Sequence, residues 1–132
     1  MQLEVGFPGN LKVEAKIRDF SVMTDQPKRS GGDDSAPSPF ELFLSALGTC
    51  AGIYIKSFCQ QRGLETDQIK LIQDVVFDMK TGLIDTISMQ IFVPEDFPEQ
   101  YHKALIKSAS LCAVKKHLHE SIKIEIDVVK NK

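Results

Sequence analysis

The sequence predicts an α+β domain with a mainly antiparallel sheet, in the element order βββ-α-ββ-α-β. Short stretches of alternating apolar and polar residues lie before, between and after two longer stretches with helical spacing. Strands that follow one another directly outnumber strands separated by a helix, which favours antiparallel pairing. The chain of 132 residues has room for one domain, residues 1–132, and none for a second sizeable core.

Three short strands are expected at the N-terminus, over Gln2–Phe7, Leu11–Ile17 and Phe20–Thr24. In the second of them, four apolar residues alternate with lysine and glutamate, and the Pro8–Asn10 segment provides the preceding turn. A long polar loop over residues 25–37 follows. Loops of this length in compact domains are often functional.

A long helix is expected from Ser38 to about Gly63. Ser38 suits the N-cap, Pro39 the first turn, and Gly63 the C-terminal stop. Apolar residues recur at helical spacing, at Phe40, Phe43, Leu44, Leu47, Ala51, Tyr54, Ile55 and Phe58. Because further small and apolar residues occupy the other positions, the helix should be buried on most sides. In a domain this small, we expect such burial to need a second subunit.

The second half should contain two strands, a second helix and a final strand. The strands are expected over Ile69–Met79 and Leu83–Val93, joined near residues 80–82. The helix should begin near Pro94 and run to about Glu120. In the last segment, Ile122–Val128, isoleucine and valine alternate with charged residues, which is typical of a strand.

Composition excludes several classes of function. The net charge of −2 provides no strong field for nucleic acid or an anionic membrane. The apolar runs look too short to span a bilayer, and the N-terminus lacks a signal-peptide pattern. We therefore expect a cytoplasmic protein that binds neither nucleic acid nor membrane.

No cofactor or metal site is expected either. The sequence has no glycine-rich phosphate loop and no cysteine–histidine cluster with zinc-ligand spacing. His117 and His119 are two positions apart on the expected helix, so their side chains point in different directions and cannot chelate one ion. Together with His102 they are best explained as surface histidines.

The three cysteines provide the candidate chemistry, since an odd number argues against a secreted disulfide framework. Cys50 and Cys112 both have small neighbours, through which a ligand or another backbone can approach closely. Two interpretations remain open at this point: the pair packs helices together as small hydrophobes, or it forms a redox site. Cys59 lies nine positions after Cys50, on the opposite face of a regular helix, and is interpreted as a packing residue.

A peroxide-reducing cysteine needs a lowered pKa, usually from a nearby cation that a carboxylate orients. Glu41 is the nearest carboxylate before Cys50, and it has two interpretations. It belongs to the site, or it stabilises the helix dipole at the N-terminus. Arg18 and Arg29 are the candidate cations, although each is also explained as a solvated surface charge. Arg29 lies in the long loop and could fold over a pocket.

The stretch from Thr24 through Ser38-Pro-Phe-Glu-Leu-Phe-Leu-Ser-Ala-Leu-Gly-Thr-Cys50 resembles the OsmC/Ohr family of osmotically inducible and organic-hydroperoxide-resistance proteins. The segment Ser110-Leu-Cys112-Ala-Val lies where that family has its second cysteine. The resemblance extends along nearly the whole chain. It implies an intertwined homodimer, with the long helices packed centrally and two sites at the subunit interface.

The resemblance also implies a thiol peroxidase acting in oxidative stress defence. Cys50 would attack an organic hydroperoxide and become a sulfenic acid. Cys112 would resolve it to a disulfide, which a dithiol reductant of the lipoyl type would reopen. The family's apolar pocket would be lined here by Phe40, Phe43 and Tyr54, although core packing is the better explanation for each of them.

The chain departs from this family at two positions. Its better-known members have Pro-Glu at the helix start, whereas here Phe40 follows Pro39 and the acid comes one place later, at Glu41. Their activating arginine has no clear counterpart, since Lys12 occupies that region of the early strands. The competing hypothesis is a non-catalytic dimer that binds a small apolar ligand at the subunit interface.

Overall fold

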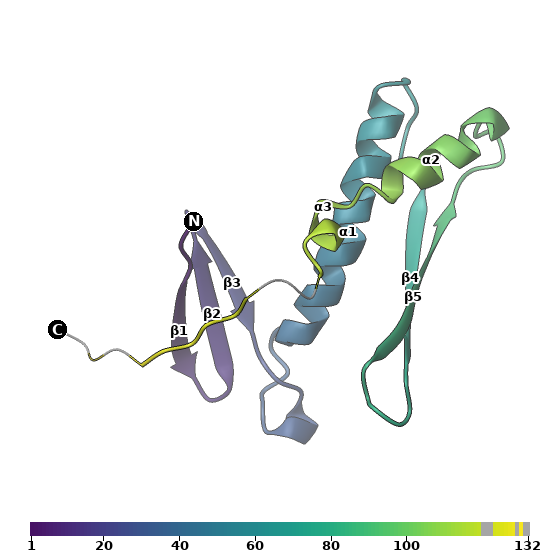
Figure 1. Ribbon diagram of the computed structural model, residues 1–132. Helices are drawn as coiled ribbons and strands as arrows, with labels where there is room; N and C mark the ends of the chain where they lie inside the picture. Colours follow the sequence, from purple (N-terminus) through teal and green to yellow (C-terminus); the bar gives the residue numbers. More distant parts are fainter. Residues whose placement is uncertain (120–122, 129, 131–132) are drawn as a thin grey trace. The chain divides into compact units, whose positions relative to one another are not determined.

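The computed structural model describes residues 1–119, 123–128 and 130, and it has the predicted α+β architecture with antiparallel sheets (Figure 1). The predicted order holds through the first six elements: three strands, the long helix and two further strands. The chain divides into two compact units, Met1–Ala46 and Leu47–Lys132.

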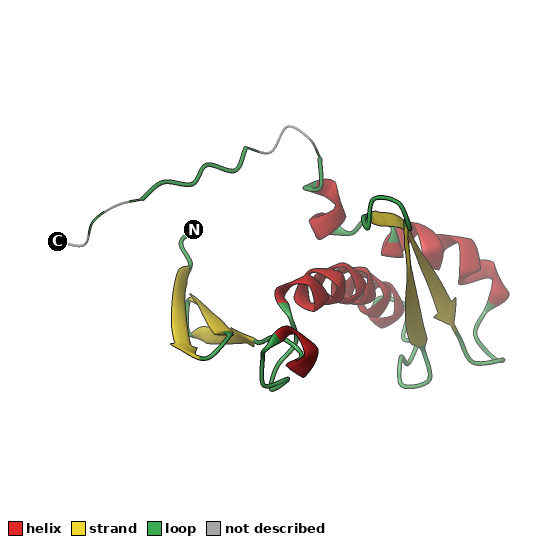
Figure 2. Ribbon diagram, turned by 90° about the horizontal axis from the view of Figure 1, so that it is seen from below, coloured by secondary structure: helices red, strands yellow, loops and turns green. Residues whose placement is uncertain are grey.

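The first unit contains an antiparallel meander of β1 (Glu4–Gly9), β2 (Lys12–Ile17) and β3 (Phe20–Thr24), coloured yellow in Figure 2. The first strand begins and ends two residues later than predicted, because Gly9 still pairs with Lys12 across the turn. The structure describes all residues of this unit, and none of its hydrophobic side chains is fully buried. The meander therefore has no hydrophobic core of its own.

The loop over residues 25–37 is held by a buried carboxylate. Asp25 is fully buried and accepts hydrogen bonds from the Ser35 hydroxyl (2.6 Å), the Ser35 N–H (3.0 Å) and the Gln26 N–H (2.7 Å). These bonds, led by the Ser35 hydroxyl, lower the pKa of Asp25 to about 2. At Gly32 a Cβ atom would lie 2.0 Å from the Gln26 carbonyl oxygen. Only glycine fits there, because the loop backbone packs closely at this point.

The long helix α1 (Pro39–Gln60) buries one face only. Its buried residues form a stripe at helical spacing: Leu47, Ala51, Ile55, Phe58 and Cys59. On another face, Ile53 keeps 61% of its surface exposed. The expectation that the helix is buried on most sides is therefore not met within a single chain. The predicted stop at Gly63 lies three residues beyond the helix, in a turn with φ +66°.

The expectation that every apolar run is too short for a bilayer was wrong for α1. By length and composition alone, its 22 residues are sufficient to cross a membrane, and an 18-residue window within the helix has a mean hydropathy of 1.5. The core helix of a folded domain meets the same criterion. The buried stripe, which begins at Leu47, packs that part of α1 in this way within the second unit.

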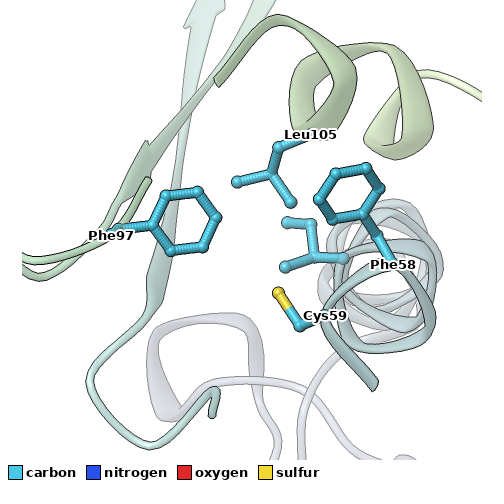
Figure 3. Close-up of a cluster of buried hydrophobic side chains, with 5 residues drawn as sticks. Phe58, Cys59, Phe97 and Leu105 are labelled. Atoms are coloured by element: carbon cyan, nitrogen blue, oxygen red, sulfur yellow. The ribbon is translucent and has the colours of Figure 1, made fainter. Parts of the chain in front are cut away.

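The second unit forms a hydrophobic core around the C-terminal half of α1. The β4 (Lys70–Phe77) and β5 (Ile84–Phe92) strands form an antiparallel hairpin, which lies beside α1 in Figure 1. The core cluster consists of Ile55, Phe58, Cys59, Phe97 and Leu105, four of which Figure 3 labels. Leu71 of β4 and Ile91 of β5 pack against it. The cluster fixes the hairpin and the following helix against α1.

The predicted second helix from Pro94 to Glu120 was wrong in its continuity. The structure has a 3₁₀ turn, η2 (Glu99–Tyr101), followed by α2 (His102–Ala109) and α3 (Ala113–Lys116). The Ser110 N–H and hydroxyl both bond back to the Ile106 carbonyl, and Cys112 then adopts ψ 117°, which is not helical. The chain therefore turns between the two helices, while Glu120 lies outside the described residues.

The predicted final strand over Ile122–Val128 is absent from its described part. Ile122 lies outside the described residues, and residues 123–128 adopt no regular structure. Ile124, Ile126 and Val128 are more than four-fifths exposed. Alternation makes a segment able to pair, but a strand forms only where another strand supplies its hydrogen-bond partners.

Candidate active site

The second unit brings Cys50 and Cys112 together. Both thiols are free, and the Cys112 thiol lies within hydrogen-bonding contact of the Cys50 sulfur. Cys50 comes from α1 and is half-buried, whereas Cys112 precedes α3 and is 4% exposed. Two residues that are 62 positions apart in the sequence (112 − 50) thus meet at one point.

Backbone amides supply the electrostatics around Cys50. The N–H groups of Val114 and Ala113 donate toward its sulfur, and the Cys112 thiol does the same. The Val114 amide is the strongest influence and the Cys112 thiol the next, and together with Ala113 they lower the pKa of Cys50 despite the opposing effect of burial. A thiolate at this position is stabilised by dipoles that require no charged side chain.

The interruption between α2 and α3 positions these donors. Cys112 is the N-cap residue of α3, and its Sγ accepts a hydrogen bond from the Lys115 N–H at 3.4 Å. Its thiol also lies 4.0 Å from the Leu47 carbonyl oxygen on α1. Because the chain turns here, the first amides of α3 are free of helical partners and are available to Cys50.

A cavity of about 730 Å³ adjoins Cys112. Its walls are mainly apolar and come from α1, the β4–β5 hairpin and α2: Leu47, Ala51, Leu71, Ile87, Met89, Ile91, Phe92 and Ile106. Gln90, Ser110 and Lys115 are its polar lining residues. The predicted apolar lining by Phe40, Phe43 and Tyr54 does not apply to this cavity, since none of the three lines it. Its volume is in the range of small-molecule sites.

Cys59 has the packing role that the sequence predicted. It is 0% exposed and belongs to the core cluster with Phe58 and Leu105 (Figure 3). Burial raises the pKa of this thiol, and the nearby charges of Lys56 and Arg62 offset part of that effect. Cys59 is therefore held in its thiol form.

Glu41 lies in a capping box at the start of α1. Its carboxylate accepts the Ser38 N–H at 2.8 Å, and the Ser38 hydroxyl accepts the Glu41 N–H at 3.3 Å. This reciprocal pair gives Glu41 a structural role at the helix N-terminus. A catalytic role for Glu41 stays a prediction.

The two candidate cations, Arg18 and Arg29, lie in the first unit, and so does Lys12. Lys12 forms an ion pair with Asp33 at 2.5 Å, and this contact raises the pKa of the lysine. The Arg18 guanidinium lies 5.0 Å from the centre of the Phe20 ring. Arg29 is exposed in a 3₁₀ turn, η1 (Lys28–Ser30). A charged side chain was expected near Cys50, and the amides of Ala113 and Val114 were missed, because the apolar spacing of residues 94–120 does not mark where α3 begins.

Comparisons with known proteins agree with this fold. The family model for OsmC-like proteins matches residues 32–127. A protein from Psychrobacter arcticus 273-4, assigned to osmotic stress induction and detoxification response, aligns with a TM-score of 0.74 and 19% identity, over 90% of this chain and 88% of that one. No match was found among curated proteins.

Two organic hydroperoxide resistance proteins also share the fold. OhrB of Bacillus subtilis aligns with a TM-score of 0.52 and 16% identity, over 92% of this chain and 93% of that one. The protein from Legionella pneumophila, described as OsmC and a redox protein, aligns with a TM-score of 0.52 and 14% identity, over 87% and 85% of the two chains. Likeness at such identities establishes the fold.

Proposed function

Since the chain belongs to the OsmC-like protein family, we propose that it is a thiol peroxidase that reduces organic hydroperoxides. The observation that carries the proposal is the convergence of the Cys112 thiol and two backbone amides on the Cys50 sulfur. Relatives with this fold are named for organic hydroperoxide resistance. Such a reaction needs a nucleophilic cysteine with a lowered pKa and a second free thiol beside it.

The proposed reaction begins at the Cys50 thiolate. Its sulfur attacks the terminal peroxide oxygen, the O–O bond breaks, and the alkoxide leaves and takes up a proton to become the alcohol. Cys50 is then a sulfenic acid. The Cys112 sulfur attacks Cys50, hydroxide leaves as water, and a disulfide forms. A dithiol reductant of the lipoyl type exchanges with that disulfide and restores both thiols, while its own sulfurs become oxidised.

The amides of Ala113 and Val114 would act at the first step. They stabilise the thiolate before it attacks, in place of the cation that the sequence failed to identify. The proposal also includes a homodimer in the cytoplasm. Support for a dimer comes from the exposed face of α1 at Ile53 and from a first unit in which no hydrophobic side chain is fully buried.

Counting thiols tests the proposal. Fully reduced protein is mixed with cumene hydroperoxide, and free thiols are measured after unfolding. The wild type should lose two thiols per chain and Cys50→Ser none. Cys112→Ser should lose one and yield a dimedone-reactive sulfenic acid. Cys59→Ala is the matched control, and its two remaining thiols should both be consumed. Unchanged thiols in the wild type after a large excess of peroxide would refute the proposal.

The cavity of about 730 Å³ supports a second candidate, a dimer that binds a small apolar ligand without catalysis. In that case Cys50→Ser would retain the protein's function. Substitution of larger side chains for those that line the cavity would remove that function. The thiol count separates the two candidates, because a binding protein has no reason to consume peroxide with a defined stoichiometry.

A further inference from the structure

The contact between Cys50 and Cys112 contains a proton that a metal ion can replace. The Cys112 thiol donates toward the Cys50 sulfur, so a hydrogen atom lies between the two sulfur atoms. When Cys50 is ionised, the pair consists of a thiolate and a thiol, with a single negative charge. A singly charged cation that takes the place of the proton, bound by two thiolates, leaves that charge unchanged. The exchange therefore adds no charge to a partly buried site.

The side chains around the pair limit the kind of metal ion that fits. Among the residues that the structure describes, no group of three or more His, Cys, Asp or Glu side chains can hold a metal ion together. Zinc takes three or four protein ligands, and calcium and magnesium prefer a shell of oxygen atoms. Two sulfur atoms supply neither set. Copper(I) is satisfied by two thiolates in a nearly linear arrangement, and thiolate ligands select it over harder ions.

The backbone groups around the sulfur atoms suit a pair of thiolates. The N–H groups of Ala113 and Val114 donate toward Cys50. The Lys115 N–H donates to Cys112 Sγ at 3.4 Å. Each sulfur therefore keeps a backbone donor after the proton between them has left. Hydrogen bonds to ligand atoms fix their orientation and tune the metal that they hold.

We propose that the reduced pair is a two-coordinate site for copper(I), with Cys50 and Cys112 as the two ligands. One ion binds per chain and displaces the proton between the sulfur atoms, which leaves to solvent. The metal keeps its oxidation state, and no electron is transferred. Copper(I) and a hydroperoxide need the same Cys50 sulfur, so bound copper blocks the reaction proposed above. The site itself does not depend on that reaction.

Retention of copper(I) against a chelator tests the proposal. Reduced full-length protein is loaded with copper(I) under nitrogen and equilibrated with the chromogenic chelator bicinchoninate. The wild type should retain about one ion per chain and show a thiolate-to-copper charge-transfer band. Cys50→Ser and Cys112→Ser should each lose at least about nine tenths of this retention. Cys59→Ala is the matched control, because it removes a thiol outside the pair, and it should retain the ion.

The number of protons released tests the exchange itself. Binding of copper(I) is followed by calorimetry in buffers of different ionisation enthalpy, at a pH where alkylation kinetics show that Cys50 is ionised. About one proton should leave for each ion bound, whereas a pair of uncharged thiols would release about two. Val114→Pro removes a donor to Cys50, so the number released at the same pH should rise. Release of two protons by the wild type would overturn the exchange.

Alkylation of the wild type provides a measurement that needs no variant. Under nitrogen, copper(I) should slow the reaction of Cys50 with iodoacetamide by at least about tenfold, because the metal occupies the reacting sulfur. The same concentration of Zn²⁺ should have much less effect, since the pair supplies too few ligands for it. Peptide mass spectrometry over time measures both rates.

Three further results would overturn the proposal: no retention of copper(I) by the wild type, full retention by either serine variant, or equal protection of Cys50 by Zn²⁺. None of these measurements uses peroxide. If copper(I) binds as expected but hydroperoxide consumes no thiols, the proposed function fails and the copper site stands. If hydroperoxide consumes the thiols but copper(I) is not retained, only the copper site fails.

Discussion

Cys50 and Cys59 lie nine residues apart on one helix, and the structure gives them opposite properties. Cys50 is half-buried, and amides from α3 lower its pKa, whereas Cys59 is fully buried in the core and burial raises its pKa. The helix itself is the same continuous element at both positions. The reactivity of a cysteine on α1 is therefore decided by what packs against its face of the helix.

The largest expected difference is in alkylation by iodoacetamide. At pH 7 Cys50 should react at least about 100-fold faster than Cys59, because only Cys50 combines a lowered pKa with access to solvent. Peptide mass spectrometry over time measures both rates in one sample. The difference should disappear in concentrated urea, where both thiols have ordinary surroundings. Similar rates in the native protein would contradict the comparison.

The second prediction concerns the core side of the helix. Cys59→Ser should lower the free energy of unfolding by about 1–3 kcal/mol, because it places a hydroxyl group in an apolar cluster. Urea denaturation measures this loss. Cys50 alkylation should be unchanged in the same variant. A change in that rate would show that the two sides of α1 are not independent.

The third prediction concerns the amides at Cys50. Val114→Pro removes the N–H with the greatest influence, so the pKa of Cys50 should rise, because the thiolate loses a donor. The pH profile of Cys50 alkylation should then move to higher pH. Ala113→Pro should produce a smaller rise, and the ψ of 117° at Cys112 suits a residue before proline. Val114→Ala keeps the amide and should leave the profile in place.

The smallest expected effects are at two glycines of α1. A Cβ at Gly52 would meet nothing within 4 Å, so Gly52→Ala should stabilise the chain by about 0.5–1 kcal/mol through helix propensity. A Cβ at Gly48 would lie 3.1 Å from Gln73 Oε1, and Gly48→Ala should gain less. Thermal unfolding measures the stability of the two variants relative to the wild type. A loss of stability at Gly52 would indicate that a surface outside this chain packs against the helix.

Local patterns predicted the parts of the fold that local chemistry determines. The alternation in β2 and β3, the cap at Ser38 and the apolar spacing of α1 each depend on residues close in sequence, and these elements were found within a few positions. The single second helix was wrong because apolar spacing does not register where the backbone leaves the helical conformation, which happens at Cys112 with ψ 117°. A final strand would need a neighbouring strand as its hydrogen-bond partner, and the alternation of residues 122–128 does not show which strand that would be.

The two cysteines of the candidate site were predictable from the sequence, but the groups that surround them were not. The resemblance singled out Cys50 and Cys112, and the structure brings them into contact. It could not identify the amide donors, because their direction depends on where α3 starts. Glu41 had two interpretations from its position alone, and the structure shows its hydrogen bonds in the capping box.

The cap at Cys112 links covalent chemistry to backbone dynamics. The sulfur that starts α3 also accepts the Lys115 N–H. Any bond formed at that sulfur changes the charge and direction of the acceptor, and with them the protection of this amide. The exchange of the Lys115 amide proton with deuterated solvent should therefore differ between the free and bonded thiol. One backbone proton would report the state of a sulfur atom in the intact protein.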